Sequence, residues 1–107
     1  MTMMHAPLKL SETSRDTDRC TLTVEGELDI ATVGQFRRSV SALLGTGCRH
    51  LEVDLGGTTF LDSSGLGALI WASHRIHAAG GEMTVVNPAP RVAKTLQITG
   101  VDRVLLA

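Results

Sequence analysis

A chain of 107 residues is the length of about one domain, and its 43% apolar and 20% charged residues are ordinary for a globular protein. The formal net charge is −1, and both signs are scattered along the chain without a basic block, which argues against nucleic-acid binding. No apolar run reaches the roughly 18 residues that cross a bilayer, and the N-terminus lacks the pattern of a secretory signal. We therefore expect a loose lead-in over residues 1–7 and one cytoplasmic domain over residues 8–107.

The two cysteines, Cys20 and Cys48, are isolated from each other in the sequence. Their spacing matches neither a set of metal ligands nor the repeated pattern of a disulfide framework. We expect two buried or half-buried free thiols, a state that suits a reducing cytosol.

The first half of the chain predicts a pair of antiparallel strands followed by a helix. Residues 8–11 form a short edge strand, and the polar residues 12–18 form a hairpin loop. Apolar and polar residues alternate over 20–25, which is typical of a strand with one buried face, and Gly26-Glu27-Leu28-Asp29 breaks it. A helical spacing of apolar residues follows over 33–44. Its start is capped by Asp29 or Thr32, and its end is closed by Gly45 and Gly47.

The second half alternates between strand and helix patterns. Gly56-Gly57-Thr58-Thr59 indicates a turn or a bulge after the first of these strands. This alternation predicts an α/β sheet with crossover helices. The predicted elements are a strand over 50–55, a helix from Asp62-Ser63-Ser64 to Gly80-Gly81, a strand over 82–86, a helix from Asn87-Pro88-Ala89-Pro90 to Gly100, and a last short strand over 104–106.

The junction Asp62-Ser63-Ser64-Gly65 allows a structural and a functional interpretation. A helix N-terminus leaves about four amides unpaired, and Asp or Ser side chains satisfy them, so capping alone explains these residues. The same position exposes the Ser63 hydroxyl where the helix dipole favours negative charge, which makes Ser63 a candidate phosphorylation site. Gly65 and Gly67 weaken the first helical turn, which favours a role in the close approach of another backbone.

A serine-nucleophile enzyme is the alternative from a different class. The segment does not match the Gly-x-Ser-x-Gly elbow, and His74 and His77 lie about 16 Å or more further along the same predicted helix, too far to act on Ser63. These histidines, three residues apart, could share a metal, but no third ligand is evident, and two solvated side chains are the simpler interpretation. We expect no catalytic residue, no metal and no cofactor.

Two further residues have an open role. Asp29 caps a helix, or it lines a surface beside Ser63 if the two strand-to-helix junctions meet at one end of the sheet. Trp71 is the only tryptophan and lies at the margin of the apolar stripe of its helix. It is a boundary residue of the core, and an exposed position would indicate contact with a partner.

Several motifs together resemble the STAS domain of bacterial anti-sigma factor antagonists, from about residue 8 to residue 107. The resemblance implies a mixed sheet of four to five strands with about three main helices packed on one side. The motifs that carry it are Val53-Asp54-Leu55, Phe60-Leu61-Asp62-Ser63-Ser64-Gly65-Leu66-Gly67, Gly80-Gly81-Glu82-Met83, Gly26-Glu27-Leu28-Asp29, and the segment from Asn87-Pro88 through Leu96 to Gly100.

The resemblance also implies a partner-switching role without catalysis. In that family, the unmodified antagonist binds an anti-sigma factor, a serine kinase of the histidine-kinase-like ATPase fold, and so frees the sigma factor. The family's kinase phosphorylates the first Ser of the motif, which corresponds here to Ser63, and so ends the complex, and a PP2C-type phosphatase restores it. A monomer is the simplest state for such an exchange of partners. The partner-binding residues it implies are Asp29, Asp62, Ser63, Ser64, Gly65, Leu66 and Gly67.

Other uses of the same family remain open from the sequence. Some of its members are soluble subunits of lipid-transport ABC systems, and others belong to stress-signalling scaffolds. Some form the cytoplasmic tail of anion transporters, a use that the lack of a membrane segment in this chain disfavours.

Overall fold

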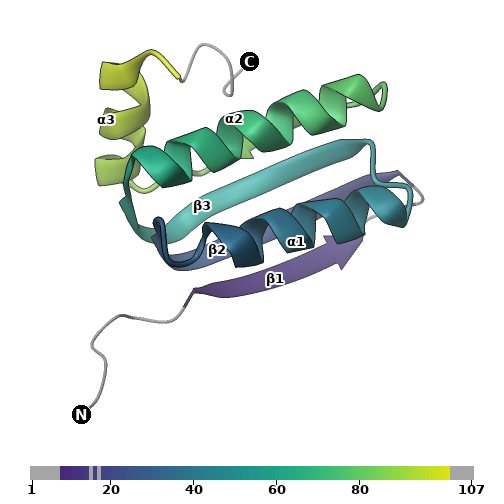
Figure 1. Ribbon diagram of the computed structural model, residues 1–107, viewed down its shortest axis with the longest axis horizontal. Helices are drawn as coiled ribbons and strands as arrows, with labels where there is room; N and C mark the ends of the chain where they lie inside the picture. The colour runs from purple at the N-terminus through teal and green to yellow at the C-terminus, as the bar shows by residue number, and fades with distance from the viewer. Residues whose placement is uncertain (1–7, 15, 17, 102–107) are drawn as a thin grey trace.

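The computed structural model describes residues 8–14, 16 and 18–101, and shows a four-stranded mixed sheet with three helices (Figure 1). The strand order in the sheet follows the sequence, β1-β2-β3-β4. This agrees with the predicted α/β class and with a sheet of four to five strands. The elements are β1 (Lys9–Ser14), β2 (Arg19–Leu28), α1 (Val33–Gly45), β3 (His50–Leu61), α2 (Ser63–Ala78), β4 (Glu82–Val86) and α3 (Pro90–Thr99).

The connections explain why α1 and α2 lie on the same face of the sheet. β1 and β2 form an antiparallel hairpin, whereas β2, β3 and β4 are parallel neighbours joined through α1 and α2. Crossovers between parallel strands are almost always right-handed, so successive crossovers in one direction place their helices on one side. Figure 1 shows α1 and α2 side by side across the front of the sheet, with α3 at its end, packed against β3.

The core fills the space between the sheet and the helices, with α1 and α2 covering one face and α3 contributing Val92 and Leu96. Alternate side chains of the strands face the helices, and the apolar stripes of the helices face back. Full burial of such a side chain contributes about 1.5 to 3 kcal/mol relative to an exposed one. The largest fully buried side chains are Phe36, Leu22, Leu28, Leu51, Leu55, Leu69, Ile76, Leu96, Val24, Val40 and Val53.

The predicted strand break at Gly26 is wrong, because β2 continues to Leu28. Two register shifts against β3 accompany this extension, one between Thr23 and Glu25 and one between Gly26 and Glu27. Gly26 has a φ of 107°, a conformation that glycine adopts without steric cost. The segment is therefore an irregular stretch of strand whose hydrogen bonds are supplied by its parallel neighbour.

The segment after Leu55 is a bulge and not a turn. β3 runs unbroken from His50 to Leu61, and Leu55 and Gly56 together lie opposite the single residue Val24 between two paired stretches. The Thr58 hydroxyl is buried and donates a hydrogen bond of 2.8 Å to the carbonyl of Val24 in β2. This bond ties the bulged strand to its neighbour, so β3 delivers its last residues to the same edge of the sheet as β2.

The third helix begins later than the sequence predicts. The N-cap is Ala89, without a side-chain cap, and Asn87 instead has a left-handed φ of 51°. The Asn87 amide donates to a carboxylate oxygen of Asp54 at 3.4 Å, so it fixes the turn after β4. Gly100 ends the helix with a φ of 76°, as predicted. The predicted strand over 104–106 and the lead-in over 1–7 lie outside the described residues.

The prediction of free thiols is wrong, because Cys20 and Cys48 form a disulfide. Both side chains are 3% exposed, and their Cα atoms are 6.1 Å apart. Cys20 lies near the start of β2, and Cys48 lies in the turn that leads into β3, so parallel pairing brings them together. The cysteines therefore give no support for a reducing compartment.

We predict that the double substitution Cys20→Ser and Cys48→Ser lowers the free energy of unfolding by about 3 to 4 kcal/mol. The disulfide closes a loop across a sequence separation of 28, and its removal restores that much chain entropy to the unfolded state. Denaturant titration of both proteins gives the difference. Reaction of the purified, unreduced and unfolded wild type with a thiol reagent should show no free thiol, and two reactive thiols would contradict the disulfide.

Candidate functional site

Two strand-to-helix junctions meet at one edge of the sheet. β2 and β3 are parallel neighbours, so their carboxyl ends lie together, and the residues that follow them are close in space. The Asp62 amide donates to the carbonyl of Leu28 at 3.4 Å, and the Ile30 amide donates to the Asp62 carboxylate at 3.3 Å. The two junctions, which carry Asp29 and Ser63, therefore fall at one end of the sheet.

Asp62 caps the second helix and also holds the neighbouring loop. Its backbone is extended, its Oδ1 accepts from the Gly65 amide at 2.9 Å, and its carbonyl accepts from the Leu66 amide at 3.0 Å. Its other carboxylate oxygen, Oδ2, accepts from Ile30 across the junction. The predicted cap is confirmed, and the same carboxylate bridges both loops of the edge.

Ser63 is the first residue of α2 and is exposed, whereas Ser64 is half-buried. Within the described part of the chain, the Ser63 hydroxyl makes no hydrogen bond. It stands at the N-terminus of a 16-residue helix, where the dipole and the unpaired amides favour a negative group. Of the two serines of the motif, Ser63 therefore has the hydroxyl that a modifying enzyme reaches more readily.

Asp29 shapes the first loop from a buried position. It is 8% exposed, and its carboxylate accepts from the Ala31 amide at 3.0 Å and from the Thr32 hydroxyl at 3.3 Å. The Thr32 hydroxyl also donates to the carbonyl of Glu27 at 2.8 Å. Thr32 occupies the N-cap position of α1 without bonding the helix amides, so neither predicted cap acts through its side chain. These bonds fix the loop that carries Ile30.

Sequence reasoning missed Ile30, whose side chain is 74% exposed beside the bridging Asp62. An apolar residue directly after Gly26-Glu27-Leu28-Asp29, at a junction, was the available signal. An exposed apolar side chain at a loop held this firmly is typical of a contact site for a partner, because it loses little entropy on binding. Ile30 therefore belongs to the candidate surface with Ser63.

The two glycines of the motif have different roles. A Cβ at Gly65 would clash with the backbone carbonyl of Leu28 and lie 2.6 Å from Leu61 Cδ1, so glycine allows α2 to approach β2 closely. A Cβ at Gly67 would meet nothing within 4 Å, and this residue is exposed. The close backbone approach at Gly65 is therefore made by β2 of the same chain and not by a partner. Leu66 is partly buried against the core.

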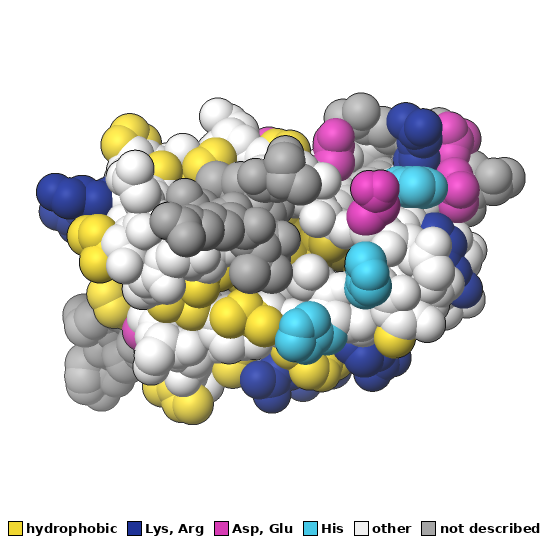
Figure 2. Space-filling model, turned by 90° about the horizontal axis from the view of Figure 1, so that it is seen from above, with side chains coloured by type: hydrophobic (Ala, Val, Ile, Leu, Met, Phe, Trp, Pro, Cys, Tyr) yellow, Lys and Arg dark blue, Asp and Glu magenta, His cyan; other side chains and the backbone are white. Residues whose placement is uncertain are grey.

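His74 and His77 are exposed on α2, as predicted. Exposed histidine side chains, in cyan, are visible in the right half of Figure 2. No cluster of three or more His, Cys, Asp or Glu residues that could hold a metal occurs among residues 8–14, 16 and 18–101. Likewise, none of the helices formed by these residues has the length and hydropathy needed to cross a membrane.

The fold and this junction define a STAS domain. The family model of the STAS domain matches residues 10–106, and the chain belongs to this family.

Two curated relatives are anti-sigma factor antagonists of bacteria. The anti-sigma F factor antagonist of Lysinibacillus sphaericus is 34% identical over 76 residues, which cover 70% of this chain and 65% of that protein. The anti-sigma F factor antagonist of Paenibacillus polymyxa is 32% identical over 83 residues, or 77% of this chain and 71% of that protein. These relatives are named for regulation and not for a catalysed reaction.

Two solved structures are similar to this chain over more than nine tenths of its length. The unphosphorylated anti-sigma factor antagonist SpoIIAA matches with a TM-score of 0.74 and 24% identity, covering 92% of this chain and 96% of that one. The phosphorylated form of SpoIIAA from Bacillus matches with a TM-score of 0.70 and 23% identity, covering 94% and 89%. This likeness establishes the fold.

We predict opposite effects for two alanine substitutions in the first turns of α2. Gly65→Ala should lower the free energy of unfolding by about 1 to 3 kcal/mol, because the added methyl group overpacks the contact with Leu28. Gly67→Ala should leave it unchanged or raise it by up to about 1 kcal/mol, because alanine is the better helix former and has open space. Denaturant titrations of the matched pair give both values, and equal effects would contradict the assigned contact.

Proposed function

We propose that this protein is an anti-sigma factor antagonist that exchanges partners under the control of Ser63. In its unphosphorylated form it binds an anti-sigma factor serine kinase of the histidine-kinase-like ATPase fold, and this binding releases the sigma factor. Phosphorylation of Ser63 by that kinase ends the complex, and a PP2C-type phosphatase restores it. The observation that carries the proposal is the exposed Ser63 hydroxyl, which makes no hydrogen bond among the described residues and stands at a helix N-terminus capped by Asp62.

The free domain tolerates a phosphate at this position. Phosphorylation adds about −1.5 to −2 charges at neutral pH. Exposed to water at the N-terminus of α2, that charge meets the positive end of the helix dipole and has room for its oxygens. We therefore expect the phosphorylated domain to keep its fold.

The same phosphate is costly inside an interface. Burial of an unpaired charge costs several kcal/mol, and the adjacent Asp62 carboxylate adds repulsion of like sign. A loss of about 4 kcal/mol corresponds to a thousandfold weaker affinity. Local electrostatics is therefore sufficient for the switch, and no rearrangement of the sheet is needed.

The proposed contact surface joins both loops of the sheet edge. Ile30, Ser63 and Gly67 are exposed, and Leu66 is half-buried between them and the core. The other residues predicted from the family motif act from below this surface. Asp29 fixes the loop of Ile30, Asp62 bridges both loops, Gly65 sets the depth of the helix, and Ser64 lies half-buried behind Ser63. We propose that the Ile30 side chain is the apolar anchor for the partner, and that phosphorylation of Ser63 controls whether the partner binds.

This role places the protein in the cytoplasm as a monomer that changes partners, and it needs no catalytic group or cofactor. Disulfides are rare in the cytosol of mesophiles, so the Cys20–Cys48 bond does not itself support that location. The proposed location follows from the proposed partners.

We predict that Ser63→Ala stays folded and binds the kinase constitutively, and that Ser63→Asp weakens binding by at least about tenfold, or 1.4 kcal/mol. The acidic side chain leaves a charge in the interface, whereas alanine leaves none. The kinase is first recovered from native lysate with Ser63→Ala as bait, and its affinity for each variant is then measured by titration calorimetry.

Ser64→Ala and Ser64→Asp are the matched control variants that test which of the two serines is phosphorylated. With ATP and the kinase, phosphate should appear on Ser63 in the wild type and in Ser64→Ala, but not in Ser63→Ala. Equal affinities for the wild type and all Ser63 variants would refute the switch, and phosphate on Ser64 would move it by one residue. Recovery of a transporter ATPase by the bait would support a lipid-transport subunit instead.

A further inference from the structure

The charged residues of the helices are all basic, whereas the strands carry acidic residues together with Lys9 and Arg19. α1, α2 and α3 contain no Asp or Glu, whereas the strands carry most of the carboxylates of the described residues. In Figure 2, most visible Asp and Glu side chains gather at the upper right, whereas Lys and Arg side chains are spread around the margins, including the lower one. The basic helix residues are Arg37, Arg38, His74, Arg75, His77, Arg91 and Lys94, and the acidic strand residues are Glu12, Glu25, Glu27, Glu52, Asp54 and Glu82.

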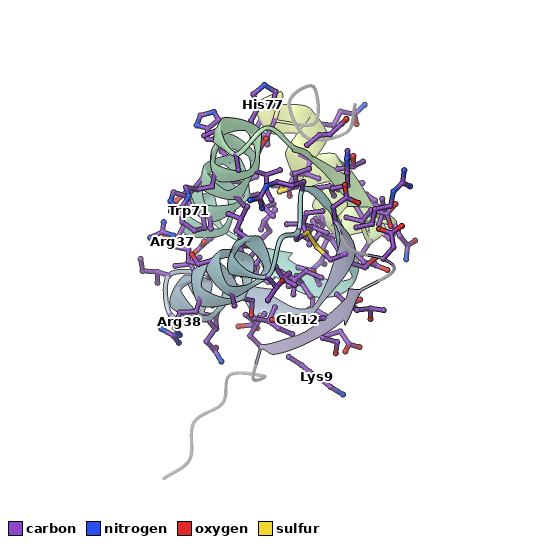
Figure 3. All side chains as sticks on the ribbon, turned by 90° about the vertical axis from the view of Figure 1, so that its right-hand side faces the viewer. Lys9, Glu12, Arg37, Arg38, Trp71 and His77 are labelled. Atoms are coloured by element: carbon purple, nitrogen blue, oxygen red, sulfur yellow. A yellow bond between two sulfur atoms is a disulfide. The ribbon has the colours of Figure 1, made fainter. Side chains whose placement is uncertain are left out.

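Two arginines from different helices converge on Trp71. The guanidinium carbon of Arg37 in α1 lies 5.7 Å from the centroid of the indole ring, and that of Arg75 in α2 lies 5.4 Å from it. Both distances are in the range of cation–π contacts. Figure 3 shows Arg37 and Trp71 next to each other on the outer side of the helices, with Arg38 lower in the view, on another side of α1. We call the surface of Arg37, Trp71 and Arg75 the arginine–tryptophan face.

The guanidinium groups of this face are held in place but keep their hydrogen-bonding capacity. Trp71 is half-buried against the core, while Arg37 and Arg75 are exposed. Neither arginine forms an ion pair with a carboxylate in the part of the chain that the structure describes. A cation–π contact uses the face of a guanidinium and leaves its N–H edge free for a carboxylate.

We propose that the arginine–tryptophan face is a docking site for an acidic segment of a protein partner. Carboxylates match the free N–H groups of two arginines, and binding would relieve the repulsion between these cations without breaking an existing ion pair. Because the indole already orders both side chains, the entropy cost of binding is small. Arg and Trp are also the residue types that contribute most strongly to interfaces.

A protein segment fits this face better than a membrane or a nucleic acid. Anionic lipid surfaces are recognised by clusters of about four to eight basic residues, more than this face has. The large exposed apolar side chains that would enter a bilayer, Ile30, Phe60 and Ile98, lie outside the face. A nucleic acid would bring a run of phosphates toward a domain whose net charge is −1 and whose strands are acidic.

The docking site does not rest on the phosphorylation switch. Trp71 lies eight positions after Ser63, which is about 12 Å along the helix axis. The face belongs to the first half of α1 and the second half of α2, whereas Ser63 stands at the start of α2. Variants of Ser63 and of the arginines therefore test the two sites separately.

Because Trp71 is the only Trp and the chain has no Tyr, its fluorescence reports directly on the face. Poly-L-glutamate serves as the acidic probe, poly-L-glutamine as the neutral control, and the intact chain is titrated at low salt. We expect saturable binding of poly-L-glutamate, and a loss of affinity of at least about tenfold in Arg37→Gln/Arg75→Gln. Circular dichroism checks that the variants are folded.

Arg91→Gln/Lys94→Gln is the matched control, because it removes the same charge from α3 and leaves the face intact. We expect its affinity to stay within about twofold of the wild type. The proposal is overturned by an unchanged Trp71 signal, by equal weakening in both double variants, or by tighter binding to phosphatidylglycerol vesicles or poly-uridine than to poly-L-glutamate.

Discussion

The carboxylate of Asp62 is the constraint on which the functional edge of this domain depends. One of its oxygens holds the first turn of α2 through Gly65, and the other holds the loop before α1 through Ile30. Parallel pairing of β2 and β3 brings these two loops together, and Asp62 fixes their relative position. Ser63 follows directly after this cap, as the exposed first residue of α2.

Two further features of the fold make this edge rigid: the close packing of α2 on β2, and a disulfide at the opposite end of β2 and β3. Gly65 lets α2 approach β2 so closely that a methyl group would not fit. At the opposite end of the same two strands, the disulfide of Cys20 and Cys48 ties the start of β2 to the turn before β3. A rigid sheet fixed at both ends suits a switch that acts through charge, since a phosphate on Ser63 then changes the surface and leaves the core as it is.

Local patterns predict most of this fold and part of the site. Periodicity locates α1 and α2, and the Asp62 cap and the exposed Ser63 follow from one short motif. What was missed depends on contacts between distant segments. β2 continues through Gly26 because a parallel neighbour supplies its hydrogen bonds, and the cysteines pair because two strands start side by side. The convergence of Arg37 and Arg75 on one indole likewise requires both helices in place, so no local pattern reveals it.

The central claim is that phosphate on Ser63 acts locally, through an edge that Asp62 has already ordered. The most direct measurement is a comparison of backbone amide chemical shifts and amide hydrogen exchange between the unmodified domain and the domain phosphorylated on Ser63. The account predicts changes confined to the two loops and the first turn of α2, with unchanged protection in the strands. Loss of protection in β2 or β3, or shifts spread through the core, would contradict it.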